Sequence, residues 1–121
     1  MNKNTLFEII LFDPENTLIT LLEKQNIEFR KLTTSHKFLV ATDKTISIVS
    51  KENNEVLIKS LVLIFMEWLK MNQDRKLQAQ LIDGAIVYIV EHNIEANTNI
   101  LNNLLKVNAF DPEYNNRIRN R

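Results

Sequence analysis

The chain contains a single glycine, Gly84, among its 121 residues. Phosphate-binding loops, dinucleotide-binding turns and the nucleophile elbow of hydrolases each need several glycines, because their backbone approaches a ligand closely. These classes of active site are therefore excluded. Cysteine is absent, which excludes thiol catalysis, disulfide bonds and zinc–thiolate centres. A cysteine-free composition fits a reducing cytoplasm, and we expect a cytoplasmic protein.

An excess of either charge is also lacking, because fifteen basic residues balance fifteen acidic ones. Domains that bind nucleic acid carry a basic excess, since contacts to phosphate supply much of their affinity. The composition therefore disfavours nucleic acid as a partner. The exception is the arginine cluster near the end, Arg117, Arg119 and Arg121. We interpret it as a candidate contact for an acidic partner and keep RNA or DNA binding there as an alternative.

The chain also lacks a long apolar run. Its longest apolar stretch, 56–69, is interrupted by Lys59 and Glu67, and it is shorter than the roughly 20 residues that span a bilayer. The polar start, Met1–Thr5, does not have the charged and apolar regions of a signal peptide. We therefore expect no membrane span.

Hydrophobic patterning predicts a βαβ unit at the start. Residues 6–12 are apolar on both faces except at Glu8, which is typical of a strand covered on both sides. A helix follows from Asp13-Pro14 to about Gln25, because Asp and Pro favour the first turn. A second strand is expected at 27–30. The tetrapeptide Phe12–Glu15 recurs as Phe110–Glu113, and we interpret both copies as caps that turn the chain.

The remaining segments predict an α+β domain. We expect one or two short strands within 36–50, a helix over 55–71, a β-hairpin over 76–91 and a last helix over 94–108. The predicted order is β-α-β-(β)-α-β-β-α, with a small mixed sheet of four to five strands and two or three helices mainly on one face. Residues 1–113 form one domain, and 114–121 form a polar basic tail that we expect to be disordered.

The hairpin offers the first candidate contact surface. Asp83-Gly84 between two strand-like runs predicts a two-residue type I′ turn. That turn pairs Leu81 with Ile86, Ala79 with Tyr88 and Leu77 with Val90 on a core face. The opposite face is then half apolar and half amide, and its candidate contact residues are Gln78, Gln80, Val87 and Ile89.

The helix over 55–71 offers the second, because it is apolar on almost every side. Such a helix is either central to a core or covered by a partner. We predict a contact with a second chain through Ile58, Val62, Phe65, Met66 and Leu69. The alternative is that the N-terminal strands and a loop of the same chain cover these side chains.

No set of residues predicts catalysis. Ser35 and His36 are adjacent in a polar segment without an oxyanion turn, and His92 and Glu91 point to opposite faces if they lie on a strand. No spacing predicts a metal site. We therefore expect no enzyme activity, cofactor or metal. A small enzyme or ligand-binding domain that uses Glu8, His36 or His92 is kept as an alternative.

One family resemblance follows from the order of short motifs across about 57–105. A long apolar helix ends in Trp-Leu-Lys, a basic-led strand and an Asp-Gly turn follow, and a Leu-rich helix closes the region; the segments are Trp68–Lys70, Arg75–Ala79, Asp83-Gly84, Ile89–Glu91 and Ile100–Leu105. This layout resembles the effector-associated constant component family of bacterial conflict systems. The resemblance implies an accessory or adaptor module beside an effector enzyme, and it implies no catalytic residues.

Together these patterns predict a non-enzymatic protein–protein interaction module. It either associates with itself or docks onto a larger effector enzyme, as a homo-oligomer or in a hetero-complex, in a role such as bacterial or antiviral defence. The alternative is a small inhibitor or immunity-type protein that binds an enzyme and blocks it. Proteins of that kind are also small and free of catalytic groups.

Overall fold

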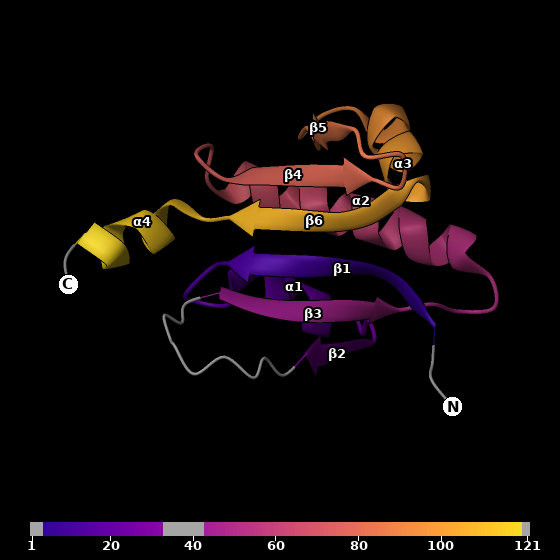
Figure 1. The fold of residues 1–121 in the computed structure, drawn as a ribbon, viewed down its shortest axis with the longest axis horizontal. Helices are drawn as coiled ribbons and strands as arrows, with labels where there is room; N and C mark the ends of the chain where they lie inside the picture. The colour runs from indigo at the N-terminus through magenta and orange to yellow at the C-terminus, as the bar shows by residue number, and fades with distance from the viewer. Residues whose placement is uncertain (1–3, 33–42, 120–121) are drawn as a thin grey trace.

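The computed structural model describes residues 4–32 and 43–119. Within them the chain forms one mixed sheet of six strands and four helices (Figure 1). The elements in order are β1 (Thr5–Phe12), α1 (Thr17–Lys24), β2 (Phe29–Leu32), β3 (Asp43–Val49), α2 (Asn54–Met71), β4 (Lys76–Leu81), β5 (Ile86–Tyr88), α3 (Ile94–Asn102), β6 (Leu104–Phe110) and α4 (Pro112–Arg119). The predicted α+β class is confirmed, but the strand number and order differ from the prediction. Of the segment 36–50, residues 43–49 form β3, and 36–42 lie outside the described residues.

The strand order across the sheet is β2-β3-β1-β6-β4-β5. β3 pairs antiparallel with both β1 and β2, so β1 and β2 run parallel with β3 between them. This arrangement is a split βαβ unit. β1 and β6 pair in parallel, and β6 pairs antiparallel with β4. The sheet therefore consists of an N-terminal half-sheet (β2, β3, β1) and a C-terminal half-sheet (β6, β4, β5), which meet at the β1–β6 pair.

Helices α1, α2 and α3 pack on one face of the sheet, as predicted, and leave the other face without a helix (Figure 1). The core between them is a single cluster of apolar side chains from the sheet and all three helices. Asn53 caps the start of α2, because its side chain accepts a hydrogen bond from the Glu55 amide at 3.0 Å. None of the helices within 4–32 and 43–119 has the length and hydropathy that crossing a membrane requires.

The predicted contact surface of α2 is wrong. α1 and α3 both pack against this helix and the sheet lies beneath it, so one chain buries almost its whole circumference. Each of the five predicted contact residues is at most 7% exposed: Ile58, Val62, Phe65, Met66 and Leu69. The alternative reading, that the chain covers its own helix, is the one the structure supports.

The predicted last helix over 94–108 is also wrong in its second half. α3 stops at Asn102, and Leu104–Phe110 form β6 in the middle of the sheet. Val107 and Ala109 are buried, whereas Lys106 and Asn108 are half-buried. This alternation has the period of a strand. The cluster of leucines at 101–105 obscures the change of period, because α3 and β6 share it.

The hairpin turns at Gly84, but with a three-residue loop. The Gly84 amide donates to the Leu81 carbonyl at 2.9 Å and the Leu81 amide donates to the Ala85 carbonyl at 2.8 Å. This is a type I turn followed by a left-handed glycine, with φ of 94°. The extra loop residue shifts the register by one, so Tyr88 pairs with Gln78 and not with Ala79. The shift turns the side chains of β5 to the opposite face.

The repeated tetrapeptides lie side by side. Phe12 and Phe110 are direct partners across the parallel β1–β6 pair, so each strand ends in Phe-Asp-Pro-Glu at the same level. The Asp111 amide donates to the Phe12 carbonyl at 2.9 Å, which extends the pairing beyond the strands. Both tetrapeptides turn the chain as predicted, whereas their pairing side by side was not predicted.

A buried polar network crosses this end of the sheet. Asp13 accepts from the Thr17 hydroxyl and the Leu18 amide, both at 2.9 Å, and so caps α1. The Thr17 hydroxyl accepts from the Trp68 indole at 2.8 Å. The Arg75 side chain covers the Trp68 ring with its guanidinium carbon 4.6 Å from the ring centroid, and donates to Asp111 at 2.7 Å. The network joins β1, α1, α2, β4 and α4 through five side chains.

The tail expectation is corrected in part. Residues 112–119 form α4, whose start is capped by Asp111 through a 2.8 Å bond from the Glu113 amide. The backbone of 114–119 is therefore helical and not disordered. Residues 120 and 121 lie outside the described residues.

Replacing the glycine tests the turn. We expect Gly84→Ala to lower the free energy of unfolding by about 1–2 kcal/mol, because a left-handed backbone places Cβ too close to the carbonyl oxygen. Crowding by the rest of the chain contributes nothing, since a Cβ at Gly84 would have no heavy atom within 4 Å other than those of Gly84 and its two chain neighbours. Urea denaturation gives the values, with Gly84→Asn as control because asparagine tolerates this region. An equal loss in both variants would contradict the assignment.

The buried ion pair generates a second prediction. Arg75 and Asp111 side chains are each only 8% exposed. We expect Arg75→Met to lower the free energy of unfolding by about 3–5 kcal/mol, because it leaves a buried carboxylate without its cation. The double variant with Asp111→Asn, which keeps the cap but removes the charge, is expected to lose less than Arg75→Met alone. Additive losses in chemical denaturation would rule out this coupling.

Candidate interaction surface

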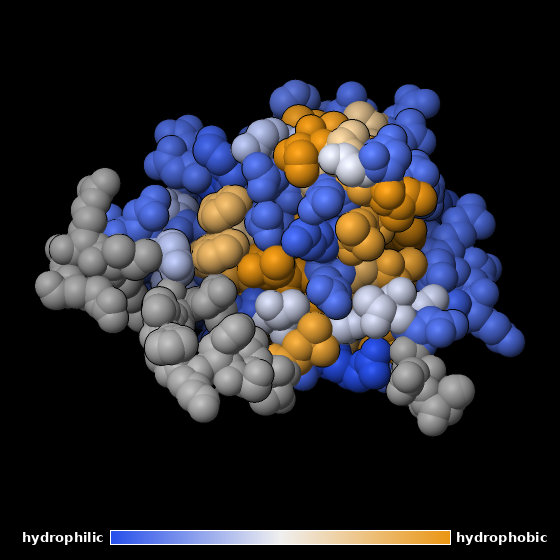
Figure 2. Space-filling model, in the orientation of Figure 1, coloured by the Kyte–Doolittle hydropathy of each residue, from blue (hydrophilic) through white to orange (hydrophobic). Residues whose placement is uncertain are grey.

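The helix-free face of the sheet is the candidate surface, and we call it the open face. Figure 2 views the molecule from this side and shows apolar side chains interspersed among polar ones. The open face is formed by the outward positions of the neighbouring strands β1, β6, β4 and β5: Glu8, Ile10, Phe12, Lys106, Asn108, Phe110, Lys76, Gln78, Gln80, Ile86 and Tyr88. Their neighbours in sequence, such as Ile9 and Val107, point into the core and are 0% exposed.

Side-chain amides form a short ladder across the open face. The Asn108 amide donates to the Gln78 carbonyl oxygen at 3.1 Å, and the Gln78 amide is 3.3 Å from the Tyr88 hydroxyl. The ladder links β6, β4 and β5 along the direction of the backbone hydrogen bonds. These polar groups are therefore bonded to one another across the strands, along the surface of the sheet.

Aromatic rings occupy the end of the open face where β1 and β6 terminate. The rings of Phe12 and Phe110 stack with centroids 4.8 Å apart and planes inclined by 11°. The Tyr114 ring of α4 meets the Phe12 ring edge-on at 5.2 Å. All three residues are half-buried. Because the stack follows the strand spacing, the rings stand upright on the sheet and present their edges outward.

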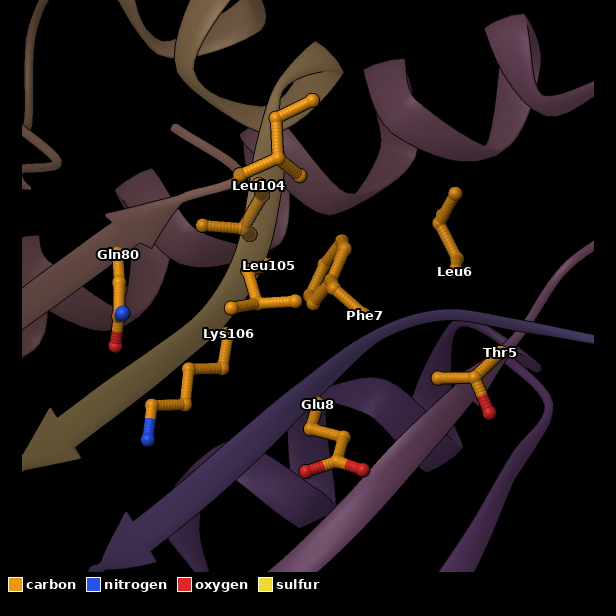
Figure 3. A pocket seen from close by; sticks show the side chains of 9 residues that line it. Thr5, Leu6, Phe7, Glu8, Gln80, Leu104, Leu105 and Lys106 are labelled. Carbon is orange, nitrogen blue, oxygen red and sulfur yellow. The ribbon is translucent and has the colours of Figure 1, made fainter. Parts of the chain in front are cut away.

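A groove lies at the opposite end of the same strand pair. β1 and β6 pair from Glu8–Lys106 to Phe12–Phe110 and diverge before that point, where β1 follows β3 and β6 follows β4. The divergence leaves a groove of about 450 Å³ (Figure 3). Its lining is mainly apolar and is formed by Thr5, Leu6, Phe7, Glu8, Gln80, Ile82, Leu104, Leu105 and Lys106. Leu105 and Ile82 are 49% and 67% exposed at its rim.

One acid and one base lie at the mouth of this groove. Glu8 and Lys106 are direct partners across the parallel strands. In Figure 3 the Glu8 carboxylate and the Lys106 amine do not point toward each other. Neither side chain has an ion-pair partner among the described residues. Glu8 is half-buried on the open face.

The structure separates the contact residues predicted on the hairpin. Gln78 and Gln80 lie on the open face, as expected. Val87 is opposite the buried Ala79, and Ile89 is only 4% exposed, so both belong to the core side and their prediction is wrong. The one-residue change of register is the cause, and it exposes Ile86 and Tyr88 in their place at 54% and 51%.

Other candidates have different outcomes. Arg117 and Arg119 lie in α4, and Arg121 lies outside the described residues. Ser35 and His36 also lie outside them. His92 is exposed after the end of β5. Within 4–32 and 43–119, no group of three His, Asp or Glu side chains could hold a metal ion.

Sequence reasoning missed the aromatic end and the groove. The signal for the aromatic end was present in the repeated Phe-Asp-Pro-Glu, since two identical strand ends can be neighbours in a parallel pair. The groove had no comparable signal, because it depends on β6, which the sequence predicted as helix.

Comparison with protein-family models, with curated proteins and with solved structures gave no match. The resemblance to the effector-associated constant component family therefore stays a prediction. One of its elements is corrected, because Ile100–Leu105 is not a single helix but the end of α3 and the start of β6.

Proposed function

We propose that the chain is a small, non-enzymatic protein–protein interaction module and that the open face is its contact surface. The observation that carries this proposal is the composition of a sheet face that no helix of the described chain covers. A solvated antiparallel face is polar at its outward positions. Here the outward positions include Ile10, Phe12, Ile86, Tyr88 and Phe110.

The residue types on this face favour a protein partner. Aromatic residues are enriched in the central part of protein interfaces, and large exposed apolar patches mark such sites on soluble proteins. The amide ladder between Asn108, Gln78 and Tyr88 supports a flat contact, because these side chains bond to one another across the strands. The neutral charge of the chain favours protein over nucleic acid.

The biological setting that we propose is bacterial defence. A role as adaptor or accessory module in a bacterial defence system follows from the family resemblance alone. The absence of cysteine supports a cytoplasmic setting. The partner is either a second copy of this chain or a larger effector, and both fit the same contact surface.

Photo-cross-linking tests the contact surface directly. We expect a benzophenone amino acid at Tyr88 to form a discrete cross-linked product with one protein when the full chain is expressed in its native host. The same probe at Leu63 is the matched control, because Leu63 lies on the outer side of α2 with similar exposure, 56% against 51% for Tyr88.

The comparison between the two positions decides the outcome. A product from Tyr88 and none from Leu63 supports the open face. Equal products from both positions, or no product from Tyr88 and from a second probe at Ile86, would contradict the proposal.

A further inference from the structure

On the open face, residues at the same level of the two central strands, β1 and β6, mostly have similar or complementary chemistry. We call the paired segments 8–12 of β1 and 106–110 of β6 the seam. From one end to the other, the seam carries the apolar groove, the Glu8–Lys106 pair, the Ile10–Asn108 pair and the Phe12–Phe110 stack. Each level except one holds residues that match each other across the strands, either in apolar character or in opposite charge.

This order makes the face complementary to itself. If a second copy faces the first and the two-fold axis runs along the seam, each β1 residue lies opposite the β6 residue of the same level. Glu8 then meets the second copy's Lys106, and Lys106 meets its Glu8. The aromatic stack meets an aromatic stack and the groove meets a groove. Ile10 opposite Asn108 is the one mixed contact.

Other two-fold axes do not satisfy the charges. An axis perpendicular to the strands at the level of Glu8 places carboxylate against carboxylate and amine against amine, which is destabilising. An axis at the level of Ile10 places both charges against the phenylalanine rings, where they would lose water without gaining a partner. Of these three axes, only the one along the seam places both Glu8 and Lys106 opposite a group of opposite charge.

Resting on the proposed function, we propose that the partner of the open face is a second copy of this chain, bound face to face about a two-fold axis along the seam. In this arrangement β4 and β5 of each copy lie opposite β3 and β2 of the other, so the contact extends beyond the open face to all six strands. Strands of three to eight residues spaced about 4.8 Å apart give about 550 Å² on each copy. The total of about 1,100 Å² is close to the lower limit for specific, stable interfaces. Because the net charge of the chain is zero, two copies do not repel each other through their overall charge.

Charge reversal in separate chains provides the test. We expect the full chain to sediment as a dimer at tens of micromolar. Glu8→Lys alone and Lys106→Glu alone are each expected to weaken the dimer at least about a hundredfold, because each creates two like-charge contacts. An equimolar mixture of the two variants is expected to dimerise again, since each contact then joins opposite charges. Circular dichroism checks that every variant is folded.

A second measurement covers the case in which a reversed variant does not fold. Because the chain has no cysteine, Leu32→Cys and Tyr88→Cys introduce unique thiols at one level of the outer strands β2 and β5, which the seam axis places opposite each other. Facing sheets lie about 10 Å apart and neighbouring strands about 4.8 Å apart, so the two different thiols lie about 10 Å apart and two identical thiols more than about 20 Å apart. We therefore expect a short bis-maleimide to join the two variants in a mixture but neither variant to itself.

The outcomes separate this inference from the proposed function. A chain that sediments as a monomer throughout, a mixture that stays monomeric, or a cysteine variant that joins itself would overturn the seam dimer. If the chain is a monomer and Tyr88 still cross-links to a different protein, the proposed function holds and only the choice of partner is wrong. If the open face gives no contact of either kind, both fail.

Discussion

The parallel pairing of β1 with β6 is the interaction on which the rest of the structure depends. β1 is the inner edge strand of the N-terminal half-sheet, and β6 is the inner edge strand of the C-terminal half-sheet. Their pairing is therefore what joins the two half-sheets into one sheet. The pairing also places two identical tetrapeptides side by side. Their aspartates cap α1 and α4, and their phenylalanines stack on the open face. One short sequence used twice therefore ends two strands, supplies a carboxylate to the first turn of two helices and forms the aromatic end of the candidate surface.

The buried network beneath that end connects the sheet to the helices. Burying an ion pair yields little net stability, because desolvation offsets the attraction between the charges. Its effect is on geometry: Arg75 binds Asp111, the carbonyl of Trp68 and the face of its ring. A guanidinium with three such contacts has one favourable position. Apolar packing alone would tolerate a shift of α2 along the sheet, and this network does not.

The first part of the fold could be predicted from the sequence, because local signals there agree with the final contacts. β1, α1, β2 and α2 follow from apolar periodicity and from Asp13 and Asn53 as caps. The C-terminal part was mispredicted where two readings were locally equivalent. Leucines at 101–105 fit a helix and a strand alike, and Asp83-Gly84 fits two loop lengths. One wrong loop length exchanged Val87 and Ile89 for Ile86 and Tyr88, so only Gln78 and Gln80 of the four hairpin residues lie on the open face.

The position of β6 has a consequence for how the protein is made. The ribosome synthesises this strand after the other five, yet it lies in the middle of the sheet. Until β6 emerges, β1 and β4 both have an inner edge without a strand, and such edges are prone to pair with other chains. Contacts between distant parts of a chain also form slowly. The half-sheets therefore remain separate through most of translation, and a single late strand joins them.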